Sequence, residues 1–114
     1  ASAIMISNHG GRQLDGSRSP FDQLKEILDA VGGKIEIICD GGIRRGTHIL
    51  KAISLGANAC SGGRLYLYAL AAGGKLGVQR SLENLKNELV RNMKLLGCKK
   101  ISELNSENLR FRNE

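Results

Sequence analysis

The sequence predicts an α/β fold in which three consecutive strand–helix units build one parallel sheet. Short apolar runs typical of strands alternate along the 114 residues with stripes of apolar residues at helical spacing. Each apolar run ends in a polar loop rich in glycine, and the chain has 15 glycines but one proline. Because a helix connects each strand to the next, right-handed strand–helix units follow. A chain of this length predicts one small domain, residues 1–114.

The first unit begins with the apolar run 3–6, which suits a strand buried on both faces. A polar loop over residues 7–16 follows it. Ser19 and Pro20 then predict a helix start, with serine as the N-cap and proline at the first helical position. One apolar stripe continues this helix before two glycines end it: Phe21, Leu24, Ile27, Leu28 and Val31.

The second unit has a predicted strand over 35–39 and a helix over 47–55. The third has a weaker strand over 57–61 and a short helix over 65–72, which continues through two glycines into a long helix. Apolar residues of the long helix are spaced four, three, four, four and three residues apart: Val78, Leu82, Leu85, Leu89, Met93 and Leu96. The polar tail, residues 106–114, is predicted to fray.

Composition excludes several classes of protein. No apolar run approaches the length of a membrane span, and the first residues do not resemble a signal peptide. Three widely spaced cysteines are neither a disulfide framework nor a zinc pattern, so no metal is predicted and a reducing, cytoplasmic location is favoured. The net charge of +6 is spread along a chain with 4% aromatic residues, which indicates a solvated basic surface and no nucleic-acid partner. Peripheral contact with the inner membrane face stays open.

The loop after the first strand contains His9 and Arg12, separated by two glycines. An imidazole can accept a proton near neutral pH, and a guanidinium can bind a carboxylate through two parallel hydrogen bonds. Glycines between them permit the close approach of a flat ligand. The residues alone leave two interpretations open, a substrate pocket or a surface loop with a hydrogen-bonded histidine.

The loops after the second and third strands resemble a phosphate cradle. In the first of these, Asp40-Gly41-Gly42 is followed by Arg44 and Arg45, and the second reads Gly62-Gly63-Arg64. Glycine amides and a helix N-terminus direct positive charge toward an anion, and arginine adds a full charge. Glycines that serve only tight turns are the alternative. The dinucleotide fingerprint, the P-loop and the serine nucleophile elbow are all absent from the sequence.

Together these motifs resemble a known family. The run Ser7-Asn8-His9-Gly10-Gly11-Arg12-Gln13-Leu14-Asp15, with the two glycine–arginine loops, is similar to the active-site signature of the FMN-dependent α-hydroxy acid oxidases and dehydrogenases. The resemblance extends over most of the chain. It implies a TIM (β/α)8 barrel, of which this chain would form the last three βα units, strands 6–8, as a partial domain.

The resemblance also implies roles for individual residues. His9 would be the base that takes the substrate proton, and Arg12 would bind the substrate carboxylate. The FMN contacts would come from the remaining matched positions: Ser7, Asp40, Gly42, Arg44, Gly63 and Arg64.

The implied function is the FMN-dependent oxidation of an L-2-hydroxy acid, foremost L-lactate, to the 2-oxo acid. The chain would act as part of a complete barrel, paired with the missing N-terminal part and homo-oligomeric when complete. The 114-residue chain by itself is expected to be inactive. The electron acceptor is not predicted. The alternative is a non-catalytic half-barrel that binds FMN or phosphate, from a split or degraded gene.

Overall fold

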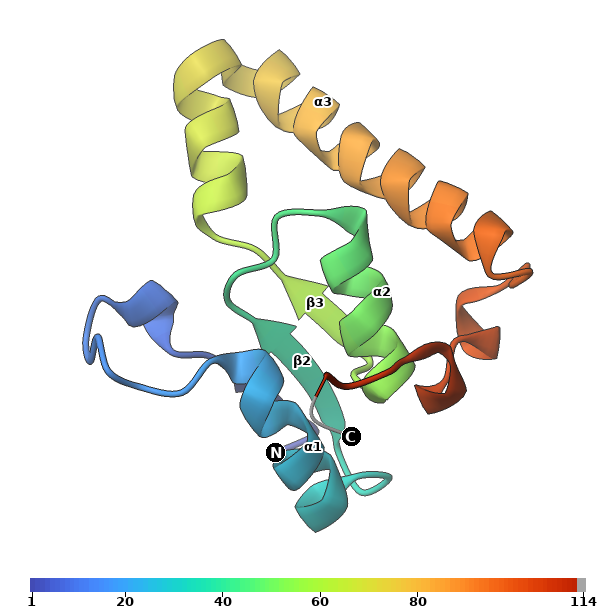
Figure 1. Cartoon of the computed structure of the whole chain (residues 1–114). Helices are drawn as coiled ribbons and strands as arrows, with labels where there is room; N and C mark the ends of the chain where they lie inside the picture. Colours follow the sequence, from blue (N-terminus) through green and yellow to red (C-terminus); the bar gives the residue numbers. More distant parts are fainter. Residues whose placement is uncertain (113–114) are drawn as a thin grey trace.

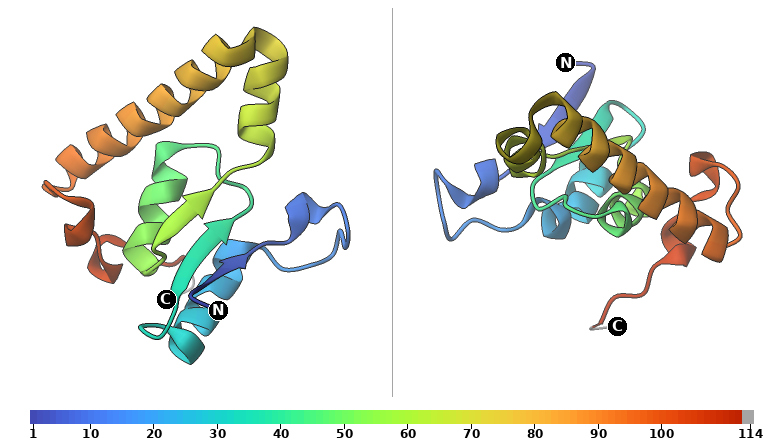
Figure 2. Two further views of the ribbon diagram at one scale, coloured as in Figure 1. Left: turned by 180° about the vertical axis from the view of Figure 1, so that it is seen from behind. Right: turned by 90° about the horizontal axis from the view of Figure 1, so that it is seen from above.

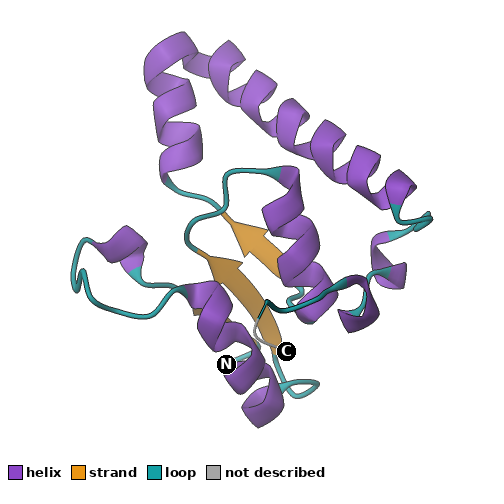
Figure 3. Ribbon diagram, viewed as in Figure 1, coloured by secondary structure: helices purple, strands orange, loops and turns teal. Residues whose placement is uncertain are grey.

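The computed structural model describes residues 1–112 and contains one three-stranded parallel sheet. Its strands are β1 (Ala3–Ile6), β2 (Glu36–Asp40) and β3 (Ala59–Ser61), in the order β1-β2-β3 (Figure 1). The predicted strand–helix alternation is therefore confirmed (Figure 3), although β2 both starts and ends one residue later than expected and β3 starts two residues later.

Two helices, α1 (Pro20–Val31) and α2 (Gly46–Leu55), cover one face of the sheet, and the view from behind shows the opposite face (Figure 2, left). Side chains alternate between the two faces along each strand. Ile6, Ile37 and Cys39 point into the helix layer and are buried, whereas Met5 lies on the other face and is 54% exposed. The main core thus lies between the sheet and the two helices, with Leu24 of α1 fully buried in it.

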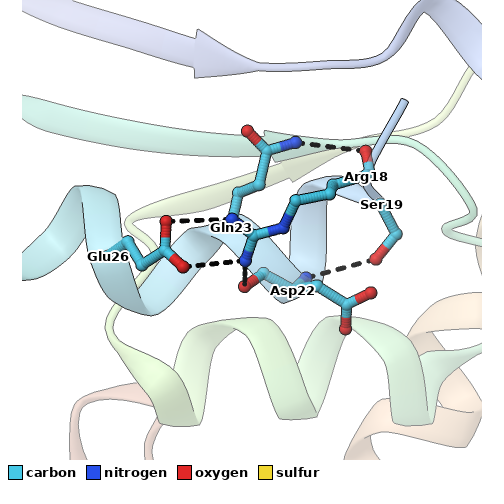
Figure 4. A network of polar contacts seen from close by, with 5 residues as sticks. All are labelled: Arg18, Ser19, Asp22, Gln23 and Glu26. Carbon is cyan, nitrogen blue, oxygen red and sulfur yellow. Dashed lines mark hydrogen bonds and ion pairs between the residues drawn. The ribbon is translucent and has the colours of Figure 1, made fainter. Parts of the chain in front are cut away.

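The start of α1 follows the sequence prediction. The Oγ atom of Ser19 accepts a hydrogen bond from the backbone N–H of Asp22 at 3.2 Å, and Pro20 occupies the first turn. Arg18, just ahead of the helix, donates two hydrogen bonds to the Glu26 carboxylate at 2.8 and 3.0 Å (Figure 4). The Ser19 contact satisfies a backbone N–H that a helix start leaves without a partner, and the Arg18–Glu26 pair ties the end of the loop of residues 7–18 to the helix.

Helix α3 (Arg64–Leu95) has two legs, because Gly73 and Gly74 adopt non-helical backbone angles within it. Figure 1 shows the first leg rising from β3 and the second descending beside α2. This is the predicted short helix joined to a long one. The predicted apolar stripe is buried only near the end of the second leg, where Met93 packs with Leu50 of α2, whereas Leu82 is 54% exposed.

Two short 3-10 helices follow, η2 (Ile101–Glu103) and η3 (Ser106–Asn108). Fraying after Asn105 stays a prediction, and the described part of this tail contains a capped turn. Asn105 caps η3 by accepting from the N–H of Glu107 at 2.9 Å, and η3 contacts α2. Polar composition suggested fraying, but asparagine also makes good local caps. Residues 113–114 of the predicted frayed segment lie outside the described residues. No described helix has both the length and the apolar character needed to cross a membrane.

Candidate functional site

The loops after the three strands meet at the carboxyl edge of the sheet and line a cavity of about 190 Å³. This edge is where α/β folds bind their ligands. All predicted site residues except Ser7 line the cavity: His9, Arg12, Asp40, Gly42, Arg44, Gly63 and Arg64. The topology therefore brings together residues from three separate loops, as the sequence predicted.

His9 begins a short 3-10 helix, η1 (His9–Gly11), in an uncommon conformation. Its φ of +53° makes it the one residue other than glycine with positive φ among residues 1–112, and Gly10 and Gly11 follow at +67° and +76°. Oδ1 of Asn8 accepts from the N–H of Gly10 at 3.1 Å, and Arg64 donates to the Gly10 carbonyl at 2.8 Å. Side chains from two elements thus hold this turn.

The positive φ of Gly10 favours glycine, and a side chain at this position would also displace the Arg64 guanidinium. A Cβ atom at this position would lie 2.6 Å from a guanidinium nitrogen of Arg64. The hydrogen bond from Arg64 to the Gly10 carbonyl depends on this close approach. The predicted substrate loop and the predicted phosphate loop after β3 therefore contact each other directly.

Ser7 lies just beyond β1 and beside Asp40, the last residue of β2. Its hydroxyl donates to Oδ2 of Asp40 at 2.7 Å and accepts from the backbone N–H of His9 at 3.0 Å. Both side chains are partly buried. Ser61, the residue of β3 paired with Asp40, continues this polar row along the edge of the sheet.

The two adjacent arginines of the loop after β2 point to different partners. Arg44 lines the cavity, whereas Arg45 pairs with Glu88 of α3, with its Nε atom 2.9 and 3.0 Å from the two carboxylate oxygens. Within residues 1–112, the recorded ion pairs involve none of Arg12, Arg44 and Arg64. Three guanidinium groups beside one carboxylate make the cavity suited to an anionic ligand.

His48, in the first turn of α2, contacts the backbone of the loop after β2. Its Nδ1 atom lies 3.0 Å from the Gly42 carbonyl oxygen and 3.1 Å from the backbone N of Arg44. Depending on its tautomer, Nδ1 donates to the first group or accepts from the second. In either state the imidazole links α2 to the loop that carries Arg44.

Glu88 closes the first turn of α2 from the neighbouring helix. Its carboxylate accepts from the backbone N–H of Gly46 at 2.8 Å and from Arg45. The hydrogen bond from Gly46, and then Arg45, lower the pKa of Glu88 although partial desolvation raises it. A Cβ atom on Gly46 would lie 2.4 Å from the backbone N of Leu89, so glycine permits α3 to approach this closely.

Sequence reasoning missed the supporting residues: Asn8, His48, Ser61 and Glu88. The first two lie close in sequence to the residues they hold, so an Asx turn and a histidine in the first helical turn were detectable signals. Ser61 requires the strand register, and Glu88 lies 43 positions from Arg45. No local pattern could have indicated that Ser61 pairs with Asp40 or that Glu88 contacts Arg45.

Comparison with known proteins places the chain in context. Residues 1–111 match the family described as FMN-dependent dehydrogenase. The chain belongs to this family. An L-lactate oxidase from Nostoc sp. is 49% identical over 106 residues, covering 93% of this chain and 29% of that protein. The 2-hydroxyacid oxidase 2 of Bos taurus is 46% identical, and the match covers 95% of this chain and 31% of that protein. L-lactate dehydrogenase (cytochrome) from Wickerhamomyces anomalus is 45% identical, and the match covers 96% of this chain and 20% of that protein.

Solved structures of the FMN-dependent dehydrogenase family share the fold. A mandelate oxidase with benzoyl-formic acid aligns with a TM-score of 0.86 at 47% identity, covering 91% of this chain and 31% of that one. A flavocytochrome b2 variant aligns with a TM-score of 0.88 at 45% identity, covering 93% of this chain and 29% of that one. The chain thus spans a third or less of the length of these relatives.

The cavity residues fit part of FMN. Arginine side chains and glycine backbone suit a phosphate, and Gly42 at φ +71° has no heavy atom within 4 Å of an added Cβ, which leaves room for a ligand. Asp40 has one carboxylate oxygen bonded to Ser7 and a second that can accept from a hydroxyl. A cavity of about 190 Å³ is smaller than the roughly 300–1,000 Å³ of a typical ligand site. These loops therefore suit one wall of the site, around the phosphate end.

Proposed function

We propose that this chain supplies strands 6–8 of a (β/α)8 barrel that oxidises an L-2-hydroxy acid, foremost L-lactate, to the 2-oxo acid. Support comes from one arrangement, in which His9, Arg12, Asp40, Arg44 and Arg64 line a single cavity in a member of the FMN-dependent dehydrogenase family. The remaining part of the barrel would be the partner that completes the site. Homo-oligomerisation and a cytoplasmic location stay predictions.

Each side chain has a proposed task. Arg12 binds the substrate carboxylate, because its planar guanidinium can donate two parallel hydrogen bonds to it. His9 takes the proton that the substrate releases when its α-carbon is oxidised. FMN, when bound, supplies the acceptor for the two electrons of the hydroxy acid. The acceptor that receives them next is not assigned.

The cofactor would be held by the two glycine–arginine loops. Asp40 and Gly42 contact the ribityl chain, and Arg44 binds the phosphate with Gly63 and Arg64. Two contacts outside the cofactor support this geometry, since His48 holds the Gly42 and Arg44 backbone and Glu88 holds the first turn of α2.

The adjacent arginines provide a matched test of the phosphate site. Arg44→Ala should weaken FMN or inorganic phosphate binding roughly 10- to 100-fold, the equivalent of about 1.5–3 kcal/mol for a charge-assisted contact. Arg45→Ala removes the same charge from the next position, but Arg45 is paired with Glu88 and does not line the cavity. The dissociation constant of Arg45→Ala for FMN or inorganic phosphate should stay near that of the wild type. Titration calorimetry measures both constants, and equal losses would contradict the assignment.

The alternative is a half-barrel that binds FMN or phosphate without catalysis. Turnover separates it from the proposed enzyme. The chain combined with the rest of a barrel should oxidise L-lactate, with His9→Ala lowering the rate while FMN affinity stays unchanged. FMN binding without turnover of any L-2-hydroxy acid in the completed barrel would favour the non-catalytic alternative.

A further inference from the structure

The backbone at His9 needs support from outside its own turn. Left-handed angles are disfavoured for a residue with a Cβ atom, and His9 adopts them at φ +53° directly before two glycines that do the same. The side chain of His9 is exposed, so packing does not hold it. A hydrogen-bond partner must therefore fix the direction in which the imidazole leaves the backbone.

Ser7 supplies that partner. Its Oγ atom accepts from the His9 N–H at 3.0 Å, and the same hydroxyl donates its one proton to Oδ2 of Asp40 at 2.7 Å. The donation to a carboxylate is short and charge-assisted, which fixes the hydroxyl rotor and leaves a lone pair directed at His9. Asn8 and Arg64 hold Gly10, the next residue, and do not reach the His9 amide.

We propose that Ser7 is a positioning residue for His9, held in place by Asp40. The inference rests on the proposed function, in which His9 is the base. It differs from the expectation that Ser7 is chiefly a cofactor contact, because the hydroxyl proton is committed to Asp40 and only a second acceptor lone pair is left for a ligand. The two hydrogen bonds link Asp40 at the end of β2 to Ser7 after β1, and Ser7 to His9 at the start of η1.

Asp40 then serves two sites at once. One carboxylate oxygen orients Ser7, and the other is available to the ribityl hydroxyls of FMN. The cofactor site and the histidine turn consequently share one side chain, so a change at Asp40 disturbs both, whereas a change at Ser7 disturbs only the turn. This asymmetry separates a positioning role from a cofactor role.

Hydrogen exchange in the full chain tests the link without any cofactor. Ser7→Ala should raise the exchange rate of the His9 amide about tenfold, because its acceptor is lost. Ser7→Thr keeps a hydroxyl that can donate and accept, and should restore the slow rate. Ser61→Ala removes a hydroxyl from the same sheet edge and should leave the His9 amide unchanged. Melting temperatures near that of the wild type show that the variants fold.

Kinetics of the FMN-loaded enzyme that contains this chain provide the second measurement. Ser7→Ala should lower kcat with FMN affinity retained, and Ser7→Thr should recover kcat. An unchanged His9 exchange rate in Ser7→Ala would overturn the proposal, as would a loss of FMN affinity as large as that of Arg44→Ala. If exchange rises in Ser7→Ala but His9→Ala keeps wild-type turnover, the base role of His9 fails while the Ser7 link stands.

Discussion

Arg44 and Arg45 show how far single residues can be interpreted from sequence. The motif indicated that an arginine of this loop faces an anion, and both side chains were candidates. The choice depends on Glu88, which draws Arg45 to α3 and leaves Arg44 lining the cavity. Because that partner comes from another helix, the doublet by itself could not separate the two arginines.

The cysteines are a second example at this scale. Cys39 and Cys60 are paired in register on β2 and β3, and both side chains pack into the core on the helix side. Burial, with the adjacent Cys39 as a second cause, raises the pKa of the Cys60 thiol to about 12. Burial and the nearby Asp40 raise the pKa of Cys39. In this environment the two cysteines pack as small hydrophobic side chains.

We therefore expect the three thiols to differ in reactivity. At pH 8, iodoacetamide should label Cys98, which lies in the partly exposed turn after α3, well before Cys39 and Cys60. Both slow thiols should become reactive when urea unfolds the chain. Peptide mass spectrometry after timed quenching gives the three rates. Labelling of Cys60 as fast as Cys98 in the folded chain would contradict the burial of that strand.

Elements with local signals were predicted correctly. The N-cap, the first-turn proline and the apolar stripe of α1 lie within thirteen consecutive positions, and the structure has that helix at Pro20–Val31. The break in α3 at Gly73 and Gly74 was visible for the same reason. What could not be predicted was which part of α3 packs, because burial of Met93 and exposure of Leu82 depend on the position of α2.

The candidate site divides in the same way. Strand ends mark the edge of the sheet, so the meeting of His9, Arg44 and Arg64 followed from topology. The contacts that hold them in place depend on exact register between separate strands. Ser7 reaches Asp40 across 33 positions, and Arg64 reaches Gly10 across 54. Such pairs carry no local sequence pattern.

Glu88 couples α3 to α2, and this coupling should depend on pH. Its pKa in the folded chain lies below the usual value of 4.5, chiefly because of the Gly46 N–H. A carboxyl with a lowered folded pKa stabilises the fold above its unfolded pKa, and the contribution disappears as the pH falls through the folded pKa. The stabilisation should therefore be complete at neutral pH and be lost below about pH 4.5.

Thermal melting between pH 7 and pH 3 tests this expectation. Glu88→Gln should melt at a lower temperature than the wild type at pH 7, because the amide loses the charge, and the difference should shrink toward pH 3. Glu83→Gln is the matched control, since Glu83 is exposed on the same helix and accepts a hydrogen bond from Gln79 of that helix. A difference between wild type and Glu88→Gln that stays constant with pH would show that the carboxylate charge does not matter.

At the scale of the whole molecule, the sheet has two unlike faces. The helix side contains the fully buried residues Leu24, Ile37 and Cys39. The other face has a row of apolar side chains in register, Met5, Ile38 and Ala59, which no described helix covers (Figure 2, left). Within the described chain, β1 and β3 are also edge strands, each with backbone groups that can pair with another strand.

Neighbouring residues of β1 separate the two faces experimentally. Ile6 is 7% exposed and Met5 is 54% exposed. Ile6→Glu places an unpaired carboxylate in the core and should cost several kcal/mol, enough to unfold a domain with a total stability of about 5–15 kcal/mol. Met5→Glu places the same charge on the open face. The fold should survive, because that carboxylate stays hydrated.

Met5→Glu should also reduce self-association. The wild-type chain at high concentration is expected to form larger species through the open apolar face and the free strand edges, since removing that surface from water is favourable by about 25 cal/mol per Å². A charge in the middle of the apolar row opposes this burial. Light scattering coupled to size-exclusion chromatography should therefore give a smaller mass for Met5→Glu than for the wild type, with circular dichroism spectra that coincide. A monomeric wild-type chain at all concentrations would contradict the expected self-association. A Met5→Glu variant as unfolded as Ile6→Glu would show that the two faces of the sheet have been assigned wrongly.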